Sequence, residues 1–327
     1  MAASVDAVVA GAGGFIGGHL VASLLAEGKT VRAVDVKPLD EWYQVHGGTQ
    51  NLQMDLADLA NCETAVGDGA AEVYNLACNM GGMGFIENNK ALCMLSVLPS
   101  THMLMAAKES EVGRFFYSSS ACVYAGYKQT EANIAPLKEE DAYPADAEDG
   151  YGWEKLFSER MCRHFREDFG LETRIARYHN IYGPVGTWDG GREKAPAATC
   201  RKIAVAALTG QKEVEIWGDG EQTRSFTYID DCVHGTKMFT RGDVTEPLNL
   251  GSSELTTINN LYYLVADIAG IDIELKHVEG ALGVRGRNSD NTLIQKYYGW
   301  EPSISLREGM SKTYEWVYDQ VKATYNL

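Results

Sequence analysis

The chain has 327 residues and a formal net charge of −16 at pH 7. Its hydrophobic content of 45% is ordinary for a soluble globular protein. The acidic balance comes without a basic stripe, which argues against a nucleic-acid partner. An anionic ligand would therefore have to be held by locally placed Arg and Lys side chains.

Seven cysteines are scattered along the chain, and none forms a C-x-x-C pair. The odd number suits free thiols in a reducing compartment, and the spacing typical of metal sites is missing, so we expect no metal. Residues 1–4 lead into an apolar strand without the features of a signal peptide, and no apolar run looks long enough to span a bilayer. We expect a cytoplasmic protein with no membrane partner.

A dinucleotide-binding pattern stands near the start of the chain. A short apolar strand at residues 8–10 leads into glycines at every third position and then into an apolar helix through Leu25. Glycines let the backbone approach a pyrophosphate, whose charge sits at the helix N-terminus. The alternative is a tight turn without a ligand. The predicted contacts are Gly11, Gly14, Phe15, Ile16 and Gly17.

The next predicted strand, residues 30–34, ends at Asp35. A carboxylate at that point can accept both ribose hydroxyls and repels a 2′-phosphate, which favours NAD over NADP. Lys37 keeps NADP open as the alternative. Asp55 and Leu56, at the end of a further apolar stretch, are predicted to complete the cofactor site.

Strand signals at residues 52–56, 72–77 and 114–118 alternate with helical stretches at 91–108 and 151–169. This alternation predicts an α/β fold with a doubly wound parallel sheet of the Rossmann type. The two helical stretches carry more apolar residues than one buried stripe needs, which indicates a helix-mediated homodimer.

Two loops follow predicted strands at the edge where ligands bind in open α/β sheets. The glycine-rich loop at residues 80–85 could hold a ligand or be a flexible turn. The serines at 118–120 could place a hydroxyl in line with a base, and the alternative is a simple serine turn.

Tyr151 and Lys155 lie four residues apart at the start of a predicted helix that Asp149 could cap. The spacing places both on one helical face, where an ammonium would lower the pKa of a phenol from about 10 and make it a general base. The same spacing occurs at Tyr124 and Lys128. A surface Tyr and Lys without a catalytic role remain the plain alternative.

Beyond residue 180, loop signals and clustered positive charge predict a second, smaller α/β lobe. Arg and Lys in residues 190–194, 223–226 and 285–289 could together grip a diphosphate. A strand at 247–251 looks as if it rejoins the sheet. The predicted boundaries are an NAD-binding Rossmann domain over residues 1–180, with 225–252 returning to it, and a substrate-binding lobe over 181–327, mainly 181–224 and 253–327.

With these features in place, the chain resembles the extended short-chain dehydrogenase/reductase superfamily along almost its whole length. Within it, the resemblance is to the GDP-mannose 3,5-epimerase family, and it rests on long separated motifs. These motifs are residues 80–86, 119–122, 179–184, 190–196 and 283–290.

The resemblance implies bound NAD and GDP-mannose as the nucleotide-sugar substrate. It implies Ser120, Tyr151 and Lys155 as the oxidoreductase set, and Cys122 and Lys194 as the base and acid that invert carbon centres. The implied substrate contacts are Gly82, Met83, Ser120, Asn180, Glu193, Lys194, Arg224, Arg285 and Arg287.

The expected reaction inverts C3 and C5 through a transient ketone at C4 and gives GDP-L-galactose without net oxidation. Dehydration is not expected, because Ala121 cannot act as the acid that related dehydratases carry. One alternative is an epimerase acting at C4, or at a single centre of another nucleotide sugar, with Cys122 merely buried. The other is a non-catalytic NAD-sensing module, which ought to have lost Tyr151, Lys155 or the serine hydroxyl.

Overall fold

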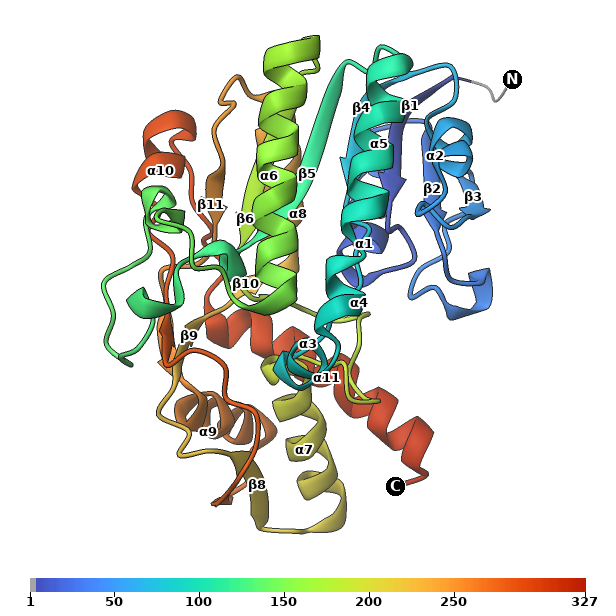
Figure 1. The fold of residues 1–327 in the computed structure, drawn as a ribbon. Helices are drawn as coiled ribbons and strands as arrows, with labels where there is room; N and C mark the ends of the chain where they lie inside the picture. The colour runs from blue at the N-terminus through green and yellow to red at the C-terminus, as the bar shows by residue number, and fades with distance from the viewer. Residues whose placement is uncertain (1–3) are drawn as a thin grey trace.

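The computed structural model describes residues 4–327, and residues 1–3, the start of the segment without signal-peptide features, lie outside the described part. A seven-stranded parallel sheet has the order β11-β6-β5-β4-β1-β2-β3 (Figure 1). The predicted doubly wound sheet is therefore confirmed. The strands are β1 (Val5–Ala10), β2 (Val31–Asp35), β3 (Gln50–Gln53), β4 (Ala70–Asn75), β5 (Arg114–Ser120), β6 (Thr173–Tyr178) and β11 (Leu248–Leu250).

Both faces of the sheet are buried, and the pleat of each strand divides its side chains between them. Val8 and Ala10 of β1 face a core shared with α2 (Leu59–Val66), α5 (Val97–Glu109) and α6 (Asp149–Phe169). Figure 1 shows α5 and α6 side by side in front of the sheet. The opposite face packs against two helices, α1 (Phe15–Ala26) and α8 (Ile229–Arg241).

The smaller lobe occupies the lower part of Figure 1, beyond the sheet. Its helices are α7 (Ala195–Thr209), α9 (Ile258–Ala269) and α11 (Leu306–Tyr325). Its paired strands are β8 (Glu213–Trp217) with β13 (Glu274–Val278), and β9 (Thr223–Ser225) with β12 (Leu255–Thr257) and β14 (Gly286–Arg287). The remaining elements are α3 (Met83–Asn88), α4 (Lys90–Met94), α10 (Thr292–Tyr298), β7 (Ile181–Tyr182) and β10 (Thr227–Tyr228).

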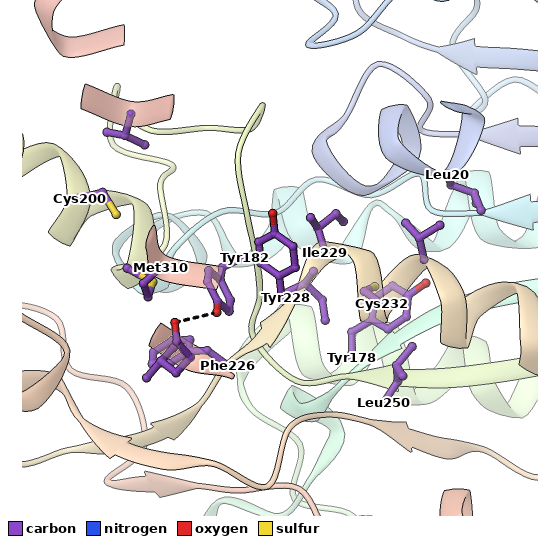
Figure 2. Close-up of a cluster of buried hydrophobic side chains, with 14 of the residues drawn as sticks. Leu20, Tyr178, Tyr182, Cys200, Phe226, Tyr228, Ile229, Cys232, Leu250 and Met310 are labelled. Carbon is purple, nitrogen blue, oxygen red and sulfur yellow. Dashed lines mark hydrogen bonds between the residues drawn. The ribbon is translucent and has the colours of Figure 1, made fainter. Parts of the chain in front are cut away.

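One apolar cluster continues from the sheet into this lobe (Figure 2). It includes Leu20 of α1 and Cys232 of α8 near the sheet, and Cys200 of α7 and Met310 of α11 in the lobe. Tyr182 lies in the same cluster, and its hydroxyl donates a 3.4 Å hydrogen bond to the Leu306 carbonyl. The lobe therefore shares a core with the sheet, and the predicted domain boundaries stay a prediction.

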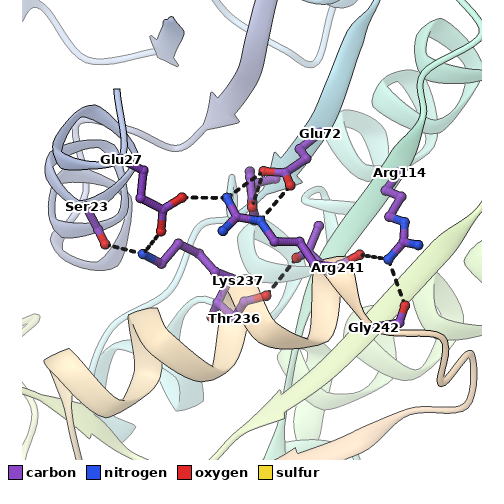
Figure 3. A network of polar contacts seen from close by, with 10 residues as sticks. Ser23, Glu27, Glu72, Arg114, Thr236, Lys237, Arg241 and Gly242 are labelled. Carbon is purple, nitrogen blue, oxygen red and sulfur yellow. Dashed lines mark hydrogen bonds and ion pairs between the residues drawn. The ribbon is translucent and has the colours of Figure 1, made fainter. Parts of the chain in front are cut away.

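The segment that returns to the sheet is fastened by ion pairs (Figure 3). Lys237 of α8 donates to Ser23 at 2.6 Å and pairs with Glu27 of α1. Arg241 reaches Glu27 at 2.8 Å and Glu72 of β4 at 2.7 Å. The strand that follows, β11, pairs in parallel with β6, as predicted for residues 247–251.

Two predicted elements differ from those observed. The strand expected at 52–56 is β3, Gln50–Gln53, an edge strand without a buried residue, so apolar patterning could not locate it. The helix expected at 91–108 is divided into α4 and α5. Around Ser96, backbone hydrogen bonds of the 3₁₀ type, which join residues three apart, replace α-helical ones. The Ser96 hydroxyl also accepts a hydrogen bond from the Asn79 N–H at 2.9 Å.

The stretch Lys90–Glu109 is long and apolar enough, by length and composition alone, to cross a membrane, contrary to the sequence-based expectation. Its mean hydropathy is 1.2, and 39% of it is buried. A core helix of a soluble protein passes the same test. Within this stretch, Met103, Leu104 and Ala107 pack into the core that α2, α5 and α6 form with the sheet.

A buried ion pair ties α6 to the carboxyl ends of two central strands. Arg177 of β6 donates to both carboxylate oxygens of Glu159 on α6, at 2.9 and 2.7 Å, and both side chains are 3% exposed. Ser119 of β5 donates to the same carboxylate at 2.5 Å. Glu159 lies one helical turn after Lys155, and Ser119 directly precedes Ser120, so the pair fixes α6 relative to the end of β5.

Replacing Glu159 with Gln should therefore destabilise the protein, because it leaves the Arg177 charge buried without its counter-ion. We expect the free energy of unfolding to fall by about 3 kcal/mol, measured by chemical denaturation. The matched control is Glu167→Gln on the same helix, where an exposed pair with Arg163 should contribute less than about 1 kcal/mol. Equal losses in the two variants would contradict a special role for the buried pair.

Candidate active site

The glycine turn between β1 and α1 has the geometry of a dinucleotide cradle. Gly11 has φ +84°, and a Cβ at that position would lie 2.9 Å from the Ala77 nitrogen. A Cβ at Gly17 would lie 2.1 Å from the Gly11 oxygen. Helix α1 starts directly after Gly14 with no acidic residue in its first turn, and Phe15 and Ile16 are half-buried there. The turn thus presents a close backbone approach and a helix N-terminus for a pyrophosphate.

Asp35 stands at the rim of this cradle, at the end of β2. Its carboxylate accepts hydrogen bonds from the Gly13 N–H at 3.0 Å and from the Lys37 N–H at 3.1 Å. The Lys37 ammonium is engaged with the Gly13 carbonyl at 2.7 Å. Asp55 is exposed and accepts a hydrogen bond from the backbone two residues on, while Leu56 is buried. The rim therefore carries a fixed carboxylate, as an NAD site requires.

Tyr151 and Lys155 lie together on α6, as their spacing predicts. The Lys155 Nζ is 5.6 Å from the centre of the Tyr151 ring and 4.8 Å from that of Tyr117. Lys155 is 1% exposed, and its ammonium has no hydrogen-bond partner within residues 4–327, although a Glu154 oxygen lies 3.7 Å away. A buried ammonium with unused donors fits the ribose hydroxyls of NAD.

The pKa of the Tyr151 phenol does not follow the sequence-based expectation. Burial raises this pKa well above its ordinary value, and the neighbouring Cys78, Cys122 and Glu154 raise it further. Only the hydrogen bond with Ser120 lowers it. The nearby ammonium therefore does not offset the burial of the phenol in the protein by itself.

The pKa of Lys155 is raised. Burial disfavours its charge, but Cys78 and Glu154 outweigh that effect. The ammonium therefore keeps its proton beside Tyr151.

Tyr124 and Lys128, which have the same spacing as Tyr151 and Lys155, have different partners in the structure. Tyr124 is fully buried, and its hydroxyl donates to Asn249. Lys128 forms an ion pair with Asp141 at 2.5 Å. Tyr124 and Lys128 are therefore not an alternative base and its cation.

Ser120 and Cys122 lie at the carboxyl end of β5, next to Tyr151. The Ser120 hydroxyl accepts a 3.2 Å hydrogen bond from the Cys122 N–H, and it lies close enough to the Tyr151 phenol to lower the pKa of that group. The Cys122 sulfur is 3.5 Å from an Arg287 nitrogen. Burial and Glu148 raise the pKa of the Cys122 thiol to about 11, against the lowering by Arg287 and Ser120. The nearby guanidinium therefore does not offset the effects of burial and Glu148 on the thiol.

Lys194 reaches the site from α7, where it is the N-cap residue. Burial lowers its pKa, while the charges of Cys122 and Cys78 act in the opposite direction. The loop that carries it is joined to the glycine-rich loop. The Gly82 N–H donates to the Arg192 carbonyl at 3.0 Å, and a Cβ on Gly82 would lie 2.5 Å from the Glu193 oxygen. Because residue 82 is a glycine, the two loops can approach this closely, and their contact holds the loop that carries Lys194.

The three predicted substrate arginines have different surroundings. Arg224 is buried, donates to the carbonyls of Thr223 and Val284, and has no ion-pair partner in the described part of the chain. Burial lowers its pKa to about 10. Arg285 is partly exposed and pairs with Asp219 at 2.8 Å, while Arg287 contacts Cys122. Of the three, Arg224 is the charge best suited to a phosphate.

The other predicted substrate residues lie around this group. Asn180 has a left-handed φ of +47° and donates its amide to the Ser225 carbonyl at 2.9 Å. Glu193 pairs with Arg201 at 2.7 Å. Met83 begins α3 and lies against Gly283, where a Cβ would be 3.0 Å from its methyl carbon.

The sequence reasoning missed two residues of the site. Glu148 is the N-cap residue of α6, where Asp149 was the expected cap, and its carboxylate pairs with Arg287 at 2.7 Å. Cys78 follows β4, and Lys155 lies close enough to it to lower the pKa of its thiol against the effect of burial. Glu148 directly precedes helix α6 with its Tyr151–Lys155 pair, and Cys78 lies between β4 and the glycine-rich loop. Their positions beside these motifs are the sequence signal that could have identified both residues. Among the described residues, no group of His, Cys, Asp and Glu is arranged to hold a metal ion.

Comparisons with known proteins agree with this geometry. The NAD dependent epimerase/dehydratase family model matches residues 7–251. GDP-mannose 3,5-epimerase 1 of Oryza sativa subsp. japonica is 46% identical over 315 residues, covering 96% of this chain and 82% of the relative. UDP-glucose 4-epimerase with UDP-glucose from Thermotoga maritima has a TM-score of 0.86 at 25% identity, covering 98% and 100% of the two chains. MoeE5 in complex with UDP-glucose and NAD gives 0.80 at 26% identity, covering 97% and 99%.

The parallel sheet, the glycine cradle and the Tyr151–Lys155 pair define an NAD-dependent enzyme of the Rossmann type. The chain belongs to the NAD dependent epimerase/dehydratase family. The resemblance recognised in the sequence motifs is thereby confirmed.

Proposed function

We propose that this protein inverts C3 and C5 of GDP-mannose through a transient ketone at C4 and releases GDP-L-galactose. The rice relative, 46% identical, carries the name of that activity. The observation that carries the proposal is the placement of Cys122 and Lys194. Cys122 is buried and Lys194 is half-buried, and the charge of Cys122 affects the pKa of Lys194 and also that of Tyr151. An enzyme acting only at C4 has no need of that second acid–base pair.

Oxidation at C4 requires a base for the hydroxyl proton and a partner for the hydride. In this scheme Tyr151 is the base, and Ser120 lowers the pKa of its phenol. The charged Lys155, 5.6 Å from the centre of the ring, would favour the phenolate. NAD, when bound, supplies the reversible hydride acceptor and a positive charge that favours the phenolate. The cradle from Gly11 to Gly17 and the carboxylate of Asp35 would hold it.

A ketone at C4 acidifies the hydrogens at C3 and C5, because an enolate spreads the charge onto oxygen. Inversion then needs a proton acceptor on one face of the sugar and a donor on the other. The pKa of Lys194 is lowered by burial, so a neutral amine is accessible, whereas the raised pKa of Cys122 keeps its thiol protonated. These directions favour Lys194 as the acceptor and Cys122 as the donor, the reverse of the order that the sequence resemblance implies.

Arg224 is the side chain we assign to the diphosphate. It is buried, carries no ion pair among the described residues, and lies close enough to Cys122 and Glu148 for their charges to affect its own pKa. Guanidinium groups bind phosphates through paired donors. We assign GDP-mannose as the particular substrate from the rice relative.

A C4 epimerase is the second candidate. It is favoured by the structural likeness to UDP-glucose 4-epimerase, with a TM-score of 0.86. Such an enzyme would use Tyr151, Lys155 and NAD alone. Cys122 and Lys194 would then fill space, and their loss would change little.

We further propose that the protein is a cytoplasmic homodimer. The outer faces of α4, α5 and α6 carry large apolar side chains that nothing covers within the described chain. Trp153 and Phe157 of α6 are 45% and 51% exposed, and Met94 beside α5 is 49% exposed. A second copy packed across these helices would bury them.

Tyr151→Phe should retain the fold and bound NAD but lose turnover of GDP-mannose by about 10²–10⁴-fold, because only the proton acceptor is removed. In the unmodified enzyme, kcat/KM should rise with pH as the phenol loses its proton, since its pKa is raised. This rise should be missing from the residual activity of the variant. Near-normal activity would show that another group is the base.

Cys122→Ala and Lys194→Ala should block proton exchange at C3 and C5 but leave oxidation at C4 possible. We expect the reduced-nicotinamide absorbance still to appear when GDP-mannose is added. Deuterium uptake from D2O at C3 and C5, located by NMR, should fall by at least about 100-fold. Cys200→Ala is the matched control, because Cys200 is a buried thiol in the smaller lobe, away from the site. Undiminished exchange in both site variants would leave the C4 epimerase as the better account.

A further inference from the structure

Cys122 has a charged neighbour that the reaction scheme does not use. Arg287 occupies one side of the sulfur, with Nη1 at 3.5 Å, and directs Nη2 to the Glu148 carboxylate at 2.7 Å. Its Nε donates to the Gln129 side chain at 2.7 Å. The side chains of Arg287 and Glu148 are only 4% and 11% exposed, so solvent screens the pair poorly.

Glu148 is also held against Cys122 through the backbone. Its N–H donates to the Cys122 carbonyl at 2.9 Å. Helix α6 packs on that same carbonyl, because a Cβ at Gly152 would lie 2.3 Å from the Cys122 oxygen. The distance between the carboxylate and the thiol is therefore set by the main chain as well as by Arg287.

The Glu148 side chain does not cap helix α6, although the residue occupies the N-cap position. At that position a side chain normally accepts a hydrogen bond from the first turn of the helix. No such bond is made, and the carboxylate points to Arg287 instead. The negative charge of Glu148 therefore acts on Arg287 and Cys122 in the site, and it does not cap helix α6.

We propose that Glu148 is a positioning residue that keeps Cys122 a protonated thiol by neutralising Arg287 beside the sulfur. A guanidinium with its counter-ion presents little net charge to the sulfur, whereas an uncompensated one would stabilise a thiolate. Its value for catalysis rests on the proposed function, in which Cys122 donates a proton to the sugar carbon and Lys194 accepts one. The effect on the thiol itself does not depend on the identity of the sugar.

The other groups around the thiol act in both directions. Arg224 brings positive charge, as does Lys194 when it is protonated. Ser120 lowers the pKa of the thiol, and Tyr151 stays neutral because its own pKa is raised. The Glu148 carboxylate raises the pKa of Cys122 in addition to the effect of burial. Removing its charge therefore leaves the sulfur facing the guanidinium groups of Arg287 and Arg224 without a compensating carboxylate.

The test is the pH dependence of Cys122 alkylation by iodoacetamide in the NAD-loaded protein, read by mass spectrometry of the peptide that contains Cys122. Thiolate is the reactive form, so the inflection reports the pKa of the thiol. Glu148→Gln keeps the size of the side chain and an acceptor for Arg287 but removes the charge. We expect the inflection to fall by about one pH unit or more, which raises the rate at pH near 8 about tenfold.

Two variants serve as controls. Asp149→Asn removes the neighbouring carboxylate, which pairs with Lys90 at 2.8 Å and is not among the groups that shift the Cys122 pKa, so the inflection should stay in place. Glu148→Asp keeps the charge and should restore most of the wild-type behaviour. In assays with GDP-mannose, the pH profile of deuterium exchange should move with the alkylation profile in Glu148→Gln.

An unchanged inflection in Glu148→Gln, or an equal shift in Asp149→Asn, would overturn the proposal. A wild-type inflection at or below the value of a free thiol, about 8.5, would overturn it without any variant. A shifted inflection in a protein that fails to convert GDP-mannose would leave the inference about Glu148 intact and remove the proposed function.

Discussion

The active site depends on the buried pair between Glu159 and Arg177, because that pair sets helix α6 against the ends of two strands. Tyr151 and Lys155 belong to α6, whereas Ser120 and Cys122 follow β5. Neither group can act without the other, and hydrogen bonds within a single helix or strand cannot align them. A charge pair that is 3% exposed on both sides tolerates little displacement, since each ion would lose its counter-ion away from water.

Burial then decides the resting protonation of the site. The same withdrawal from water raises the pKa of the Tyr151 phenol and the Cys122 thiol and lowers that of Lys194. All three groups are thereby biased towards their neutral forms. Charged neighbours adjust this bias locally, since Arg287 lowers the pKa of the thiol and Glu148 raises it. A positive charge arriving with NAD acts on the same balance, which couples cofactor binding to activation of the base.

The parts of the site that the sequence predicts are those built from local patterns. Glycines at every third position and a Tyr and Lys four apart carry their geometry within one turn or one helix. The contact between Cys122 and Arg287 joins residues 165 positions apart, and that between Arg287 and Glu148 spans 139. Only the folded chain shows that Arg287 faces the thiol and that Glu148 leaves its helix uncapped to meet it. The bounds of the edge strand β3 could not be predicted for a related reason, because it has no buried residue that would produce an apolar pattern.

The central claim is that C4 is oxidised and restored by the same hydride while C3 and C5 exchange protons with water. It is tested most directly with GDP-mannose that carries deuterium at C3, C4 and C5, incubated with the NAD-loaded enzyme in ordinary water. NMR of the product should show deuterium retained at C4 and replaced by hydrogen at C3 and C5. Loss of deuterium from C4, or its retention at both C3 and C5 in a converted sugar, would contradict the mechanism.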